Sequence, residues 1–60
     1  MDLFASLITV INSKKKAHDN GRMSDAEYKA HVINMTKKIN ILAEHGKLSA
    51  EQAENLKNMM

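Results

Sequence analysis

Apolar residues recur at helical spacing through the middle of this chain. The main stripe has spacings of four, three, four and three positions, which place its members on one face of a helix: Tyr28, Val32, Met35, Ile39 and Leu42. A second, weaker stripe lies nearly opposite and consists of Ala26, Ala30, Ile33 and Ile41. Because a helix packed between two others needs two apolar faces, we expect this helix to be central in the fold.

The segments that flank this helix carry almost the same sequence. NGRMSDAEY runs over residues 20–28 and HGKLSAEQA over residues 45–53. In each copy, a Gly that can adopt the left-handed conformation of a helix end is followed three positions later by Ser, a preferred N-cap. Three positions after each Ser comes Glu27 or Gln52, which is the spacing of a capping box. Each copy therefore predicts the end of one helix and the start of the next.

The two corners together predict three helices, over about residues 2–19, 25–44 and 50–59. The apolar residues before each Ser, Met23 and Leu48, can pack on Tyr28 and Ala53 as hydrophobic staples. On the short third helix, we expect an inward face made of Ala53, Leu56 and Met60. The predicted fold is all-α and forms one domain over residues 1–60, a three-helix antiparallel bundle or helical hairpin repeat with a long central helix.

The predicted first helix is apolar over an unusually wide sector. Two adjacent stripes make up this sector, Leu3, Leu7 and Val10 in one and Phe4, Ile8 and Ile11 in the other. No charged residue lies between Asp2 and Lys14, and folded proteins rarely leave large apolar patches unused. We therefore expect a partner protein or a second copy to complete the bundle. The alternative is that the other two helices together cover this sector.

The expected interface consists of apolar residues from the first and middle helices, namely Leu3, Phe4, Leu7, Ile8, Ile11, Ile33 and Ile41. The size of the chain favours such an interface, because 60 residues bury only about 60% of their unfolded surface. The sequence has no Cys, so neither a disulfide nor a thiolate metal site can stabilise it. Oligomerisation or a protein partner, giving a homodimer or a small regulator or inhibitor, is the remaining source of stability.

The charge of the chain is weakly basic, with a formal net charge of +2. The residues that could contact nucleic acid are Lys14, Lys15, Lys16, Lys37 and Lys38. These lysines also suit a solvated helix end and face, and no aromatic residue accompanies them for base stacking. We therefore expect a protein partner first and nucleic acid as the alternative. A first helix lying on a membrane surface is less expected, because its basic residues gather at one end.

Catalytic or metal chemistry is not expected. The three histidines, His18, His31 and His45, lack the spacing of four positions on one helix that a metal pair needs. Ser24 and Ser49 are explained as caps, and the chain has no glycine-rich phosphate loop. We expect no enzyme activity, no cofactor, no metal and no small-molecule substrate.

A cytoplasmic location is expected, because no basic segment and no cleavage site accompany the N-terminal apolar run. That run, residues 3–11, is shorter than the roughly 20 residues that cross a bilayer.

The second corner resembles the SHOCT class of short helical hairpins. In residues 42–60, the matching positions are Leu42, Gly46, Leu48, Ser49 and Glu51. Residues 21–32 fit as well, with Tyr28 where the class usually has an aromatic, whereas the second copy departs from the pattern at Ala53. The resemblance implies a non-enzymatic interaction or oligomerisation module and supplies no catalytic residues. A short chain with its own Met1 is also similar to the small accessory proteins of phages and mobile elements.

Overall fold

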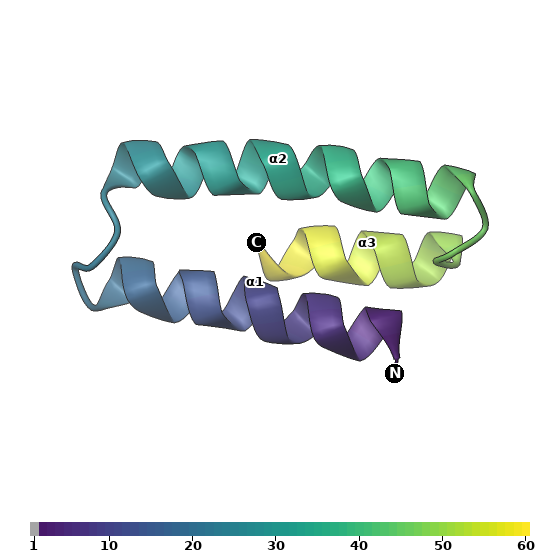
Figure 1. Ribbon diagram of the computed structural model, residues 1–60, viewed down its shortest axis with the longest axis horizontal. Helices are drawn as coiled ribbons and strands as arrows, with labels where there is room; N and C mark the ends of the chain where they lie inside the picture. The colour runs from purple at the N-terminus through teal and green to yellow at the C-terminus, as the bar shows by residue number, and fades with distance from the viewer. Residues whose placement is uncertain (1) are drawn as a thin grey trace.

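The computed structural model describes residues 2–60, which form three helices and no strand. Helix α1 spans Leu3–Asp19, α2 spans Asp25–Glu44 and α3 spans Ala50–Met59. The chain reverses direction at both corners, so α1 and α3 run opposite to α2 (Figure 1). The prediction of an all-α chain with three helices, the middle one longest, is confirmed.

Both helix ends that precede a corner have the same backbone geometry. Gly21 has a φ of +74° and Gly46 a φ of +75°, the left-handed conformation that Gly adopts without a steric penalty. The N–H of the following residue, Arg22 or Lys47, donates to the carbonyl five positions earlier at 2.9 and 2.8 Å. These bonds form a Schellman motif at each corner and satisfy carbonyls at the helix end.

Both helix starts after a corner carry a complete capping box. Ser24 Oγ accepts the N–H of Glu27 at 3.1 Å, and Ser49 Oγ accepts the N–H of Gln52 at 3.0 Å. The Glu27 and Gln52 side chains accept the N–H of their Ser, each at 3.1 Å. Helices α2 and α3 therefore begin where predicted, and the predicted capping hydrogen bonds are present at both starts. Helix α1 starts one residue later than expected, at Leu3, because Asp2 is its N-cap.

The core is small and entirely apolar. Its buried residues are Leu7, Ile11, Met35, Ile39, Leu48, Ala53 and Leu56. Each of the three helix pairs is in contact, so α1 and α3 pack on each other as well as on α2. The inward face predicted for α3 is confirmed, with Ala53 and Leu56 buried and Met60 half-buried.

The expectation that α2 would be packed between the other two helices is wrong. Both α1 and α3 lie on the side of α2 that carries Met35 and Ile39, whereas Ile33 and Ile41 on its second stripe are 46% and 53% exposed. The other two members of this stripe, Ala26 and Ala30, are small and are exposed as well. Lys37 lies four positions from each isoleucine, on the same face of α2, and is exposed, so its long side chain can keep its charge in water beside them.

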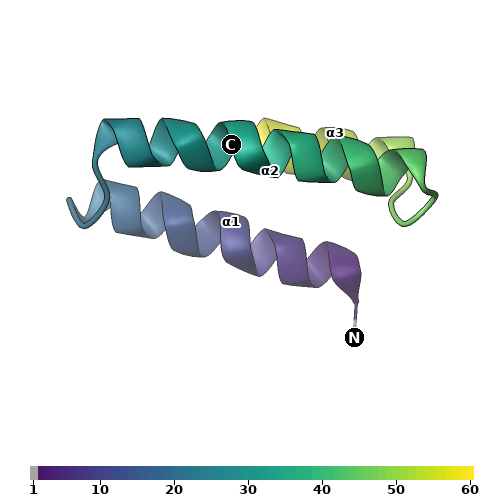
Figure 2. The same cartoon turned by 45° about the horizontal axis from the view of Figure 1, so that its top comes forward.

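Helix α3 covers only part of the hairpin formed by α1 and α2. Its 10 residues span about 15 Å, whereas the 20 residues of α2 span about 30 Å. Figures 1 and 2 show α3 beside the part of α2 that leads to the second corner, with the C-terminus near the middle of the molecule. None of residues 12–34 is buried. We call residues 12–34 the two-helix half, and residues 2–11 with 35–60 the three-helix half.

Candidate functional site

The apolar face of α1 is largely used inside the chain. Leu7 and Ile11, at 3% and 0% exposure, belong to the core, so neither can contact a partner unless the helices separate. The other three predicted interface residues of α1, Leu3, Phe4 and Ile8, are half-buried and pack against that core. The width of the apolar sector on α1 predicts that the other helices leave much of it exposed. Helices α2 and α3 together cover more of it than expected, because α3 packs directly on α1.

Among residues 2–60, the large apolar side chains that stay exposed lie in two places. Val10 on α1 is 40% exposed; it belongs to a stripe recognised in the sequence, although it was not among the predicted interface residues. The second place is the outer strip of α2, which we define as Ala26, Ala30, Ile33 and Ile41, all exposed. Ile33 and Ile41 lie on the side of α2 away from α1 and α3, whereas Ala30 also borders the space between α1 and α2. The structure therefore does not join Ile33 and Ile41 to the predicted α1 residues in one surface.

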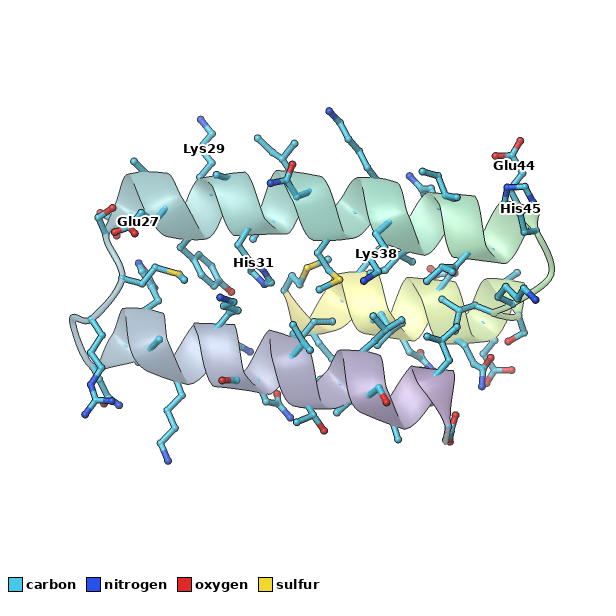
Figure 3. The ribbon with its side chains drawn as sticks, in the orientation of Figure 1. Glu27, Lys29, His31, Lys38, Glu44 and His45 are labelled. Atoms are coloured by element: carbon cyan, nitrogen blue, oxygen red, sulfur yellow. The ribbon has the colours of Figure 1, made fainter. Side chains whose placement is uncertain are left out.

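A shallow depression lies between α1 and α2 and contains two of the lysines that the sequence singles out. Its volume is ≈ 450 Å³ and it is lined by Lys14, Met23, Glu27, Ala30, His31, Asn34, Met35 and Lys38. Figure 3 shows His31 and Lys38 pointing from α2 toward α1, whereas Lys29 points away from it. Lys15, Lys16 and Lys37 are exposed but do not line this basic depression. The structure thus divides the predicted lysines.

His31 is the least exposed of the polar residues that line the basic depression. Its Nε2 atom is buried and has no hydrogen-bond partner. Burial, and then the nearby positive charge of Lys14, lower the pKa of His31 below its ordinary value of 6.5. The imidazole is thereby favoured in its neutral form, and the positive charge of the basic depression comes from its two lysines.

A small aromatic cluster connects the two helices at the first corner. The rings of His18 and Tyr28 stack with centroids 4.5 Å apart, and the ring of His31 lies 5.9 Å from that of Tyr28. His18 Nε2 donates to Asp25 Oδ1 at 2.7 Å, which links the end of α1 to the start of α2. The contacts of His18 with Tyr28 and Asp25 could not be predicted from the sequence, because they depend on how α2 lies against α1.

The three histidines do not converge on a metal-binding arrangement. His18 and His31 flank Tyr28, whereas His45 is exposed at the second corner. Within residues 2–60, no three His, Asp or Glu side chains come together as potential metal ligands. None of the helices in this part of the chain has both the length and the apolar character needed to cross a bilayer.

Comparisons with known proteins identify no relative: no protein-family model, no curated protein and no solved structure matches this chain. The resemblance of the two corners to the SHOCT class therefore stays a prediction. Its physical basis is nonetheless visible, because Gly46, Ser49 and Gln52 form a Schellman motif followed by a capping box. The same geometry at both corners explains why the corner sequence occurs twice in the chain. It assigns no activity.

Proposed function

We propose that this protein is a non-enzymatic protein-interaction module that associates with a second copy of itself. The observation that supports this proposal is the exposure of Ile33 and Ile41, at 46% and 53%, on one face of α2. The seven buried residues among residues 2–60 form a small core, which gives so short a chain little reserve of stability. Pairing of two outer strips would remove apolar surface from water and supply part of what the small core lacks.

Self-association would complete the helical bundle between two molecules. In a symmetric dimer, the same patch of each copy meets the other, so one short strip on each suffices to form the contact. The predicted α1 residues outside the core, Leu3, Phe4 and Ile8, form a second and less exposed candidate surface together with Val10. Through either surface, the module could also dock on a larger protein and act as its regulator or inhibitor.

Sedimentation equilibrium at micromolar concentration tests the proposal and separates the two surfaces. We expect a wild-type mass of about twice that of the monomer, as in a two-fold dimer. The double variant Ile33→Glu/Ile41→Glu should sediment as a monomer, because a dimer would have to bury its added charges. Val10→Glu reports on the α1 surface in the same assay.

A matched control adds the same charge elsewhere. Asn12→Glu/Asn55→Glu changes two exposed residues that lie outside both surfaces and should keep the wild-type mass. A wild-type chain that remains monomeric at every concentration contradicts self-association. Loss of the dimer in Val10→Glu alone would instead assign the contact to α1.

Nucleic-acid binding is a second candidate because Lys14 and Lys38, from different helices, line the same depression. Phosphates of a nucleic-acid backbone would be attracted to such a pair, and most strongly at low salt. A gel-shift titration at low and moderate salt tests this candidate. Absence of a shift at low salt would rule it out, since phosphate contacts are strongest under that condition.

A further inference from the structure

The basic depression is rich in hydrogen-bond donors and poor in acceptors. Lys14 from α1 and Lys38 from α2 supply two ammonium groups, and Asn34 adds an amide. Within residues 2–60, the only pair at ion-pair distance is His18 with Asp25, so no carboxylate neutralises either lysine. Two cations from separate helices therefore face one volume, and the one carboxylate that lines it, Glu27, is at ion-pair distance from neither.

The single carboxylate at the basic depression is engaged elsewhere. Glu27 Oε1 accepts the backbone N–H of Ser24 at 3.1 Å, as part of the first capping box. This bond, and then the hydrogen bond with the Ser24 side chain, lower the pKa of Glu27 from 4.5. Glu27 thus stays ionised at the rim and is held toward the first corner, where Figure 3 shows it at the start of α2.

The volume of the basic depression also suits a polyatomic anion. One water molecule takes about 30 Å³ of liquid, so ≈ 450 Å³ can hold an oxyanion together with part of its hydration shell. His31 lies beside this volume with an unpartnered Nε2 atom. The charged or titratable groups around His31 are Lys14 on α1 and Glu27, Tyr28 and Lys38 on α2.

We propose that the basic depression binds a divalent oxyanion of the phosphate class, held between Lys14 and Lys38. Both ammonium groups donate charge-assisted hydrogen bonds to its oxygens, which are stronger than bonds between neutral groups. Asn34 can donate a further bond. The negative charge of the anion also favours protonation of His31, so binding and the protonation state of His31 are coupled. This activity needs no protein partner and stands independently of self-association.

An NMR titration with inorganic phosphate at constant ionic strength tests the proposal, with acetate as the singly charged comparator. Phosphate should produce saturable shifts in the His31 ring and in the amides of Lys14 and Lys38, and it should raise the pKa of His31. Acetate should bind at least about tenfold more weakly, because it offers one charge to two cations. Shifts that grow linearly without saturation, or equal responses to both anions, would overturn the proposal.

Two double variants with the same change in charge locate the binding. Lys14→Gln/Lys38→Gln removes both ammonium groups of the depression and should weaken phosphate binding by roughly tenfold or more. Lys29→Gln/Lys37→Gln removes two exposed lysines of α2 outside it and should leave the affinity unchanged. Equal loss in both variants would show general attraction to a basic protein and contradict the assignment. Circular dichroism confirms that each variant is helical, and the wild-type titration tests the proposal even if one variant unfolds.

A short single-stranded oligonucleotide, titrated in the same way, identifies the source of the phosphate. Binding of inorganic phosphate without any binding of the oligonucleotide supports a small phosphate-bearing ligand. Tighter binding of the oligonucleotide, lost in Lys14→Gln/Lys38→Gln and kept in Lys29→Gln/Lys37→Gln, supports the same depression and assigns its phosphate to a nucleic-acid backbone. Binding that both double variants lose alike would count against the depression.

Discussion

The two corners of this protein have almost the same sequence, but they lie in different environments. At the second corner, Leu48 before the cap and Ala53 after it are both 5% exposed and belong to the core. At the first corner, the equivalent residues Met23 and Tyr28 are only half-buried. The backbone and capping hydrogen bonds are the same at both corners, and the difference in burial lies in what packs against them.

That difference comes from the length of α3. The three-helix half contains all seven buried residues, because α3 closes over α1 and α2 there. The two-helix half has no third helix and relies on the His18–Tyr28 stack and on the hydrogen bond from His18 to Asp25. A corner motif therefore sets the direction of the chain, whereas a third packed element is needed to form a dry core. Six of the eight residues that line the basic depression belong to the two-helix half.

The largest expected effect is on stability, from a core substitution in the three-helix half. Leu56 is 0% exposed, and Leu56→Ala should cost about 2–5 kcal/mol of unfolding free energy through lost burial and a cavity. Val32→Ala in the two-helix half should cost only about 1 kcal/mol, because Val32 is half-buried. Urea unfolding followed by circular dichroism measures both. Equal losses would contradict the contrast between the halves, and Leu56→Met is the volume-conserving control.

A smaller effect, equal at both corners, is expected for the glycines. Gly21→Ala and Gly46→Ala should each cost about 1–2 kcal/mol, because both positions have a positive φ that disfavours a Cβ. No atom lies within 4 Å of the Cβ that either change would add, so packing should not separate them. Urea unfolding is again the measurement. Clearly unequal losses would show that the corners differ locally as well, and the Asn variants should recover part of the loss.

Acidification should weaken the two-helix half through His31. Because the pKa of His31 is lowered from 6.5 in the folded chain, the unfolded chain takes up its proton at a higher pH. The contribution of the neutral His31 to the unfolding free energy is therefore present above pH 6.5. It is lost as the pH falls below 6.5 and through the folded pKa. His31→Gln should flatten this part of the stability–pH profile in thermal unfolding. His45→Gln, at an exposed position, is the matched control and should keep the wild-type slope.

The smallest expected effect distinguishes the two capping boxes. The pKa of Glu27 is lowered from 4.5, so its contribution is present above that pH and is lost as the pH falls through the folded pKa. Gln52 accepts the equivalent bond without a charge and should not respond to pH. Hydrogen exchange at the Ser24 amide should show protection that falls below pH 4.5 in the wild type and persists in Glu27→Gln. Loss of protection at Ser49 over the same range would contradict this explanation.

The sequence predicts the helices well because their ends are marked by local chemistry. Gly, Ser and Glu or Gln at fixed spacing fix where α2 and α3 begin, independently of the rest of the fold. Asp2 at the start of α1 is the same kind of signal, and taking it as an N-cap would have corrected that helix by one residue. The inward face of α3 could also be read from its periodicity.

The packing of the helices could not be predicted in the same way. Periodicity shows that α2 has two apolar stripes, but it does not show that α1 and α3 both pack on the stripe with Met35 and Ile39. The burial of Leu7 and Ile11 depends on the direct contact of α1 with α3, which no local motif encodes. The basic depression combines Lys14 with Lys38, 24 positions apart, and only the antiparallel pairing of α1 with α2 places them together.

The position of the last helix has a practical consequence for labelled versions of this chain. Helix α3 ends near the middle of the molecule and points along the hairpin toward the first corner (Figure 1). A fluorophore or affinity tag joined after Met60 would therefore extend over the two-helix half, next to the basic depression. Helix α1 starts at the opposite end, beside the second corner, so a label attached there would leave that half free for titration experiments.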